Sequence, residues 1–267
     1  RISPAFRTRK ESTQLPSEQT GGAISICYLV HYFYPNRTGG TERFVLNMAI
    51  EQQKRGNKVC VLTLGLLPLK DYSRQIGDIF CRDYEYEGIL ITEIRYRKAP
   101  KGLYYKRMED NDSAMIGFAH NFLDRENPDI VHCAYPQPFS AFLKVCKERG
   151  ISYLVTLTDF NIFCHFATMV DKKGRFCAGC DGGLRCAKVC PTYGIHDFTS
   201  RKKVATRLLE EAAAITAPSA FVAQIVEQEF PNMKPYVIPH GISEAFVAQE
   251  KRKQTKRFLY IGSLSEP

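Results

Sequence analysis

The sequence lacks the long apolar run that a membrane-spanning helix needs. None of its hydrophobic segments approaches the roughly 18 residues required to cross a bilayer. The first residues, RISPAFRTRKESTQ, carry no apolar stretch behind their basic side chains, so we expect no signal peptide there. The chain begins at Arg1 instead of Met, from which we expect a piece of a longer protein. With 44% hydrophobic and 24% charged residues, the composition is typical of a soluble globular protein.

The formal net charge of +9 and the pI near 9.0 indicate an anionic partner. A phosphate group, a membrane headgroup and a nucleic acid would each satisfy that charge. Plain solubility explains it equally well. Charge alone therefore does not choose among these classes.

Ten cysteines are present, and their distribution argues against a disulfide scaffold. Cys27, Cys60, Cys133 and Cys146 lie inside apolar runs, where a free thiol behaves as a small core hydrophobe. A secreted disulfide-rich domain is shorter and spreads its cysteines more evenly. We therefore predict a reducing compartment, and hence a cytoplasmic protein.

Short apolar runs alternate with helical periodicity from residue 21 onward. Residues 1–20 are polar and basic, and we predict a disordered leader or linker there. The alternation predicts an α/β fold: a Rossmann-like, doubly wound parallel sheet with a cysteine-rich loop insertion. Strands are predicted at 24–30, 58–64, 88–96, 129–134, 152–158, 213–218 and 235–239, and helices at 41–55, 112–126, 138–150, 199–212 and 220–229.

This pattern predicts one domain over residues 21–254, followed at 255–267 by the first strand of a second domain. In parallel sheets covered by helices, ligands bind beyond the carboxyl ends of the strands. The loops after Val30, Ala134 and Thr158 are therefore the candidate binding loops.

Gly39 and Gly40 lie between the first predicted strand and its helix. Glycine permits a close approach of ligand to backbone, and the N–H groups of a helix's first turn favour an anion. A simple turn, with Thr41 capping the helix and Glu42 in its first turn, explains the pair equally well. The stretch GGTERF lacks the third glycine of a dinucleotide fingerprint, so that class of site is not indicated.

Five stretches, in order, resemble the N-terminal domain of GT-B fold glycosyltransferases of family four. They are P-x-x-x-G-G-x-E at 35–42 with KRGNKVCVLTL behind it, the segment from PDIVH to TLTDF, AAAITAPSAFVAQIVEQEF, YVIPHGIS, and RFLYIGSLSEP. The fourth has His240 where asparagine is usual. The resemblance covers roughly residues 22–267.

The resemblance implies an enzyme that moves a sugar, a hexosyl group, from a nucleotide-sugar donor to a glycan or lipid-linked acceptor with retention. The donor would lie mainly in a C-terminal domain, and this N-terminal domain would bind the acceptor. Backbone N–H groups of Gly39 and Gly40 would stabilise the leaving diphosphate, with Arg37 near enough to help. Glu42 is expected to be a structural residue. Residues 1–267 alone are expected to be inactive.

Members of that family often have histidine before the acidic residue at the loop where this chain has Thr158 and Asp159. That departure puts a histidine role in doubt. Asp159 is interpreted as accepting a proton from an acceptor hydroxyl, as binding sugar hydroxyls, or as a turn cap. His165 is an alternative catalytic residue. His31 and His132, at two strand ends, are more often structural.

Five cysteines crowd one loop, residues 164–190. Their spacing, with C-x2-C and C-x3-C, is close to that of metal ligands, and we predict a structural zinc. Four thiolates leave no open position for catalysis. The best quartet is Cys177, Cys180, Cys186 and Cys190, with Cys164 as a substitute for one of them. A disulfide pair, unligated thiols and an iron–sulfur cluster remain alternatives.

Two other function classes compete with the transferase. One is a zinc-stabilised module that binds nucleic acid, and the other is an iron–sulfur or redox domain. The basic residues are scattered and no aromatic-plus-basic stacking pattern is present, so we expect no nucleic-acid partner. We assign the positive charge instead to peripheral contact with an anionic membrane at its inner face, where a lipid-linked acceptor would be found.

Overall fold

The computed structural model describes residues 22–99, 108–171, 173–190 and 194–242. The leader expected at 1–20 and the strand expected at 255–267 lie outside the described residues. No helix within the described ranges has the length and apolar character needed to span a membrane.

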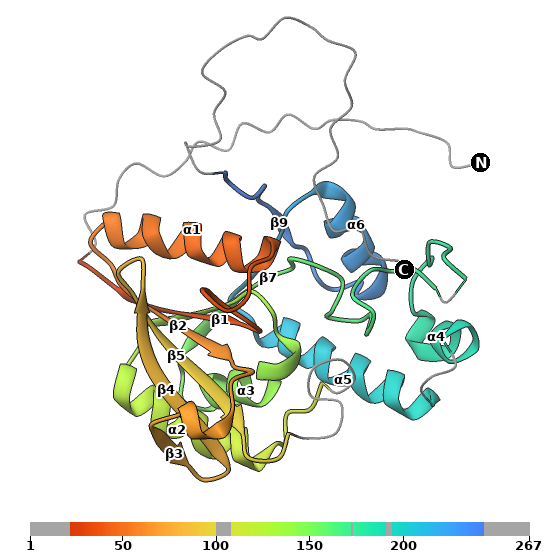
Figure 1. The fold of residues 1–267 in the computed structure, drawn as a ribbon. Coiled ribbons are helices and arrows are strands. Elements are labelled where there is room, and N and C mark those ends of the chain that lie inside the picture. Colours follow the sequence, from red (N-terminus) through yellow and green to blue (C-terminus); the bar gives the residue numbers. More distant parts are fainter. Residues whose placement is uncertain (1–21, 100–107, 172, 191–193, 243–267) are drawn as a thin grey trace, which may run out of the picture.

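The described strands form one mostly parallel sheet (Figure 1). Its order is β3-β4-β5-β2-β1-β6-β7-β8-β9, with antiparallel pairing at β3–β4 and β4–β5 and parallel pairing from β5 onward. The strands are β1 (Ser25–Val30), β2 (Lys58–Leu64), β3 (Arg74–Ile76), β4 (Ile79–Tyr86), β5 (Ile89–Tyr96), β6 (Ile130–Cys133), β7 (Ser152–Thr156), β8 (Ala214–Ala217) and β9 (Tyr236–Val237).

Helices cover both faces of the sheet, which confirms the predicted Rossmann-like α/β fold. Figure 1 shows α1 over one face and α2, α3 and α5 over the other. The helices are α1 (Gly40–Lys54), α2 (Ser113–Glu126), α3 (Ser140–Glu148), α4 (Leu184–Val189), α5 (Ile195–Glu211) and α6 (Ala220–Glu229), with short 3₁₀ turns at Leu69–Asp71, Gln137–Phe139 and Asp181–Gly183.

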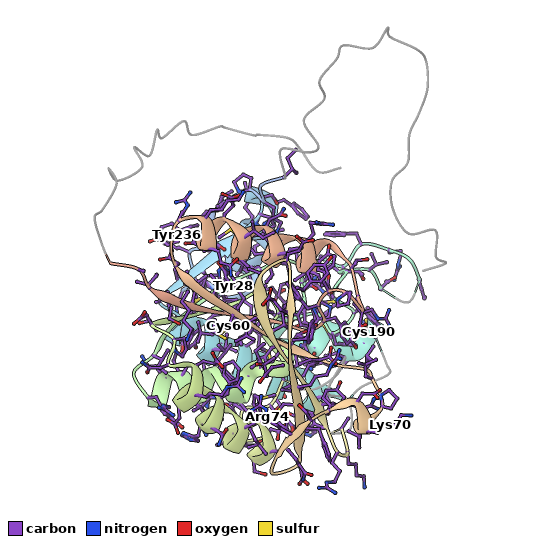
Figure 2. The ribbon with its side chains drawn as sticks, turned by 60° about the vertical axis from the view of Figure 1, so that its left-hand side comes forward. Tyr28, Cys60, Lys70, Arg74, Cys190 and Tyr236 are labelled. Carbon is purple, nitrogen blue, oxygen red and sulfur yellow. The ribbon has the colours of Figure 1, made fainter. Side chains whose placement is uncertain are left out.

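Apolar side chains fill both sides of the central strands. Alternate residues of β1 divide between two core clusters: Tyr28 packs with α1, whereas Cys27 and Leu29 pack with α2 and α3. Figure 2 shows Tyr28 and Cys60 within this central region. Because both faces are buried, these strands are nearly continuous runs of apolar residues, which is why the sequence predicted them.

The antiparallel hairpin β3–β4 at the sheet edge was not predicted. Ile79 and Cys81 of β4 are buried, whereas Asp83 and Glu85 are exposed, so apolar character is lost after the first half of the strand. An edge with one solvated face carries only a weak hydrophobic pattern. The short helix α4 was missed as well, inside the stretch interpreted as a cysteine loop.

The strand order reverses between β1 and β6, and this is where the ligand-binding crevice of an open α/β sheet is expected. The chain leaves β1 toward β2 on one side, and the later strands β6, β7 and β8 are added on the other. The connections diverge at that point, and open α/β sheets bind their ligands there, beyond the carboxyl ends of the strands. The loops after β1, β6 and β7 therefore meet at one edge of the sheet.

Candidate active site at the carboxyl edge of the sheet

The glycine pair forms the N-terminus of α1. Gly39 is the N-cap in an extended conformation, and the helix begins at Gly40. No side chain caps this end, so Thr41 is not the cap that the simple-turn interpretation requires. The first-turn N–H groups have no partner within the helix, and they give this end a partial positive charge.

The two glycines differ in what surrounds them. A Cβ on Gly39 would lie 2.5 Å from Oε2 of Glu42, so this glycine is required by its own packing. A Cβ on Gly40 would have no heavy atom within 4 Å. The fold therefore does not need glycine at position 40, and the open space beside it is accessible to a ligand.

The Thr158 hydroxyl ties the helix end to two strand ends. Thr41 Oγ1 donates to Thr158 Oγ1 at 3.0 Å, and Thr158 Oγ1 donates to the carbonyl oxygen of Ala134 at 3.0 Å. Thr158 follows β7 and Ala134 follows β6. This bridge brings the glycine loop against the loop that carries Asp159.

The Asp159 side chain is partly exposed, and one of its two carboxylate oxygens accepts a hydrogen bond. Its Oδ1 accepts a hydrogen bond from the Asn161 backbone N–H at 2.7 Å, the turn-capping contact predicted as one alternative. Within the described part of the chain, Oδ2 has no hydrogen-bond partner. Burial raises the pKa of Asp159 to about 6, against the opposing effects of the Asn161 N–H and the Arg201 charge. The carboxylate is therefore ionised at pH 7 but close to its titration range.

A row of side chains crosses the crevice between β1 and β6. Asn161 Nδ2 donates to the Tyr135 hydroxyl at 2.9 Å, and the Tyr135 ring stacks on His31 with centroids 3.9 Å apart. His31 Nε2 lies 3.6 Å from Oε1 of Glu42. Two buried atoms of this row, His31 Nδ1 and Asn161 Oδ1, have no hydrogen-bond partner among the described residues. Buried polar atoms normally have partners, so these two are candidates for a ligand contact.

Burial is the main cause of the pKa shifts of His31 and Glu42 in this row of side chains. It lowers the pKa of His31 to about 4, so the ring is neutral at pH 7. It also raises the pKa of the Glu42 carboxyl, although the charge of Arg37 acts in the opposite direction. The His31–Glu42 contact is therefore not an ion pair at neutral pH.

Arg37 is exposed and lies beside this row. Its guanidinium lies over the Tyr32 ring at 5.6 Å from the centroid, and its charge reaches Glu42. No ion pair of Arg37 occurs within the described ranges. Its charge is accordingly available to an anionic group near α1.

Arg201 of α5 is a site-forming residue that sequence reasoning missed. Its side chain is 2% exposed, and its Nη2 donates to the carbonyl oxygen of Asn161. Its charge also faces Cys164 and Asp159. Arg201 is thus hydrogen-bonded to the loop that carries Asp159. No sequence signal distinguished it, because it opens a basic run, RKK, of the kind usually found on a solvated helix face.

The candidate histidines lie in different surroundings. His132 is buried, bonds Thr156 Oγ1 through Nε2 at 2.7 Å, and has its pKa lowered to about 3 by burial. It is the structural histidine expected at that strand end. His165 is also buried, with its ring against Phe166 and Phe198, which places it with the cysteine loop.

The five loop cysteines gather around Cys186. Burial, followed by the nearby Cys180, Cys164, Cys177 and Cys190, raises the pKa of the Cys186 thiol to about 12. Cys180 Sγ donates to Oε2 of Glu229 at 2.6 Å. Figure 2 shows Cys190 apart from Cys60 of the central sheet. Even so, no group of three or more His, Cys, Asp or Glu side chains in the described residues forms a metal site, so the structure does not support the predicted zinc.

Solved structures similar to the chain are glycosyltransferases. Sucrose-phosphate synthase from Thermosynechococcus elongatus is 12% identical, with 81% of this chain and 48% of that chain covered and a TM-score of 0.49. A glycosyltransferase from Rickettsia africae is 18% identical, with 83% and 44% covered and a TM-score of 0.47. The catalytic domain of starch synthase IV from Arabidopsis thaliana is 11% identical, with 81% and 52% covered and a TM-score of 0.42.

The chain spans about half the length of these structures. None of the curated proteins compared with the chain matches it. The family model described as Glycosyltransferase Family 4 matches residues 38–168, the stretch that runs from the glycine pair through Thr158, Asp159 and His165. Residues 38–168 are therefore similar to family 4 glycosyltransferases, and the strands that this stretch contains belong to the Rossmann-like sheet.

Proposed function

We propose that the chain is the acceptor-binding half of a retaining hexosyltransferase that uses a nucleotide-sugar donor. Its acceptor is a glycan or a lipid-linked glycan. Because the chain spans about half the length of the similar structures, we assign most of the donor contacts to a second domain and expect residues 1–267 alone to be inactive. A cytoplasmic location and contact with an anionic membrane stay predictions of the sequence.

The hydrogen-bonded bridge through Thr158 carries this proposal. It holds the uncapped end of α1 against the Asp159 loop, at the crevice where open α/β sheets bind ligands. A donor diphosphate at the glycine loop would then lie beside a carboxylate that can orient an acceptor hydroxyl. In the proposed reaction, both partners of the sugar transfer would thereby be brought to one place.

The donor diphosphate is assigned to backbone N–H groups of α1 and to the Arg37 guanidinium. N–H groups of the first turn, at Gly40 and Thr41, would stabilise the charge that builds on the leaving diphosphate. The open space beside Gly40 allows that approach, and the exposed guanidinium of Arg37 adds positive charge.

The acceptor side is assigned to Asp159. Its Oδ2 would accept a hydrogen bond from the attacking hydroxyl, while Oδ1 stays on the Asn161 N–H and fixes the carboxylate. Thr158 has a positioning role through its bridge. The third candidate catalytic residue, after Asp159 and Thr158, is His165, which packs with the cysteine loop.

Gly40→Val is predicted to abolish use of the donor without unfolding the protein. The valine side chain would enter the open space beside α1 and block the diphosphate, although no protein atom lies within 4 Å of its Cβ position. Loss of such backbone stabilisation typically costs on the order of 10²–10³-fold in rate. The measurement is nucleotide release from UDP-, GDP- and ADP-sugars by the full-length protein that contains this chain.

The control for this experiment is Gly22→Val, which also has no heavy atom within 4 Å of its added Cβ and lies before β1. It should release nucleotide at the parent rate. If Gly40→Val matches this control on a donor that the parent protein uses, the glycine pair serves only as a turn.

Asp159→Asn is predicted to stabilise the fold at about pH 7.5. The raised pKa means that the folded state holds the Asp159 proton more tightly than the unfolded chain does, so wild-type stability falls as pH rises from about 4 toward 6. Asparagine keeps an oxygen for the Asn161 N–H but carries no charge. Urea unfolding at about pH 7.5 and about pH 4.5 should show a gain that is largely lost at the lower pH.

The exposed Asp78→Asn serves as the control and should show no comparable gain. An Asp159→Asn variant that is equally or less stable than wild type at about pH 7.5 would contradict the assigned burial of the charge.

We also propose that the loop holds a structural zinc through Cys177, Cys180, Cys186 and Cys190, with Cys164 as the substitute ligand. The proposal is motivated by the cysteine spacing and by the proximity of the thiols, since Cys180, Cys186 and Cys190 pack in one small cluster. Since the described residues contain no ready metal site, the thiols must move to coordinate, and Cys180 must leave Glu229.

Elemental analysis of protein purified without chelator tests this second proposal. One zinc per chain is expected, and Cys186→Ser should lose it, whereas Cys164→Ser should keep it if the quartet is correct. Protein without metal, with the loop thiols free or disulfide-bonded, would overturn the zinc site. Stoichiometric iron with visible absorbance would replace it with an iron–sulfur cluster.

A further inference from the structure

A cavity opens beside the glycine loop, on the β2 side. Its volume is about 270 Å³, and it lies between the loop after β1 and the loop after β2. Residues 32, 33, 36 and 37 form one wall, residues 64–67 the other, and Glu93 of β5 the floor. All of these residues are described, and none has a role in the site above except Arg37.

The floor of this cavity is held rigidly. Glu93 is 2% exposed, and its carboxylate accepts hydrogen bonds from Tyr72 Oη at 2.7 Å and from Arg82 Nε and Nη2, both at 3.2 Å. A Cβ on Gly65 would overlap both the Tyr72 hydroxyl and the Glu93 carboxylate. Glycine at 65 is therefore required for this arrangement, which makes the cavity a built feature and not a gap between loops.

The cavity wall holds polar groups that a ligand can recruit. Asn36 Nδ2 lies 3.5 Å from Glu93 Oε2, at the long limit for a hydrogen bond, so its amide can turn to a ligand at little cost. Arg37 forms no ion pair in the described part of the chain. Tyr32, Phe33 and Leu66 add ring and apolar surface, with Leu66 46% exposed at the rim.

Arg37 connects this cavity to the glycine loop. It lines the cavity, and its charge reaches Glu42, whose carboxylate lies against Gly39. A group bound in the cavity would therefore lie next to the position proposed for the donor diphosphate.

The size and lining select the class of ligand. Pockets for drug-sized ligands are typically about 300–1,000 Å³, so a cavity of about 270 Å³ holds one ring and not a whole nucleotide sugar. Amide, guanidinium and phenol groups beside apolar surface suit a ring that has hydroxyls on its edge and C–H groups on its faces. We infer that this cavity binds a single pyranose unit of the acceptor, held by Asn36 and Arg37. This inference rests on the proposed function and assigns its acceptor subsite.

Leu66→Trp is predicted to fill the cavity and to remove sugar binding. The probes are methyl glycosides of glucose, galactose, mannose and N-acetylglucosamine, measured by saturation-transfer NMR with the full chain. At least one should bind, and Leu66→Trp should raise its Kd by about tenfold or more, roughly the loss of one well-placed group. Asn36→Ala should weaken the same glycoside without filling the cavity.

Leu90→Trp is the matched control, because Leu90 is 40% exposed on β5 and does not line the cavity. It should bind the glycoside as the parent chain does. Equal binding by Leu66→Trp and the parent, or no binding of any of the four glycosides, would overturn the inference. Nucleotide release to water by the parent full-length protein, measured without any glycoside, separates the two proposals: release without glycoside binding means that this subsite fails while the proposed transferase stands.

Discussion

The hydroxyl of Thr158 is the contact on which the candidate site depends. It accepts from Thr41 at the start of α1 and donates to the Ala134 carbonyl after β6, while its own backbone continues β7. Each such hydrogen bond contributes only about 1 kcal/mol to net stability. The two hydrogen bonds together matter more for geometry than for stability. They fix the start of α1 and the ends of β6 and β7 against one another, where the sheet order reverses. The Thr158 hydroxyl joins the first turn of α1, which follows the glycine pair, to the loop that carries Asp159.

Burial, more than charge pairing, determines the electrostatics of this edge. It keeps His31 neutral at pH 7, raises the pKa of Glu42, and brings the pKa of Asp159 to about 6. Under the proposed function, the positive potential for a diphosphate would therefore come from the helix N-terminus and from Arg37.

Much of the fold was predictable because its central strands are buried on both faces and are separated by helical periods. The binding edge followed from the topology alone, since carboxyl ends of parallel strands share one edge. The β3–β4 hairpin was not predictable, because its solvated face interrupts the apolar pattern.

The contacts that build the site were harder to predict. Thr41 and Thr158 are far apart in sequence, and nothing local marks them as partners. Arg201 belongs to a basic run, yet its side chain is buried and donates to the carbonyl oxygen of Asn161. The crowding of the loop cysteines was foreseen from spacing, whereas the bond from Cys180 to Glu229 depends on α6 packing beside them.

The most direct test compares Thr158→Ser with Thr158→Val in the full-length protein, by the rate of nucleotide release from its donor. Serine keeps the hydroxyl and both hydrogen bonds, whereas valine has nearly the shape of threonine but can make neither. The bridge predicts that serine retains most of the activity and that valine loses roughly tenfold or more, since about 1.4 kcal/mol corresponds to a factor of ten. Equal activity of the two variants would contradict the bridge as the contact that assembles the site.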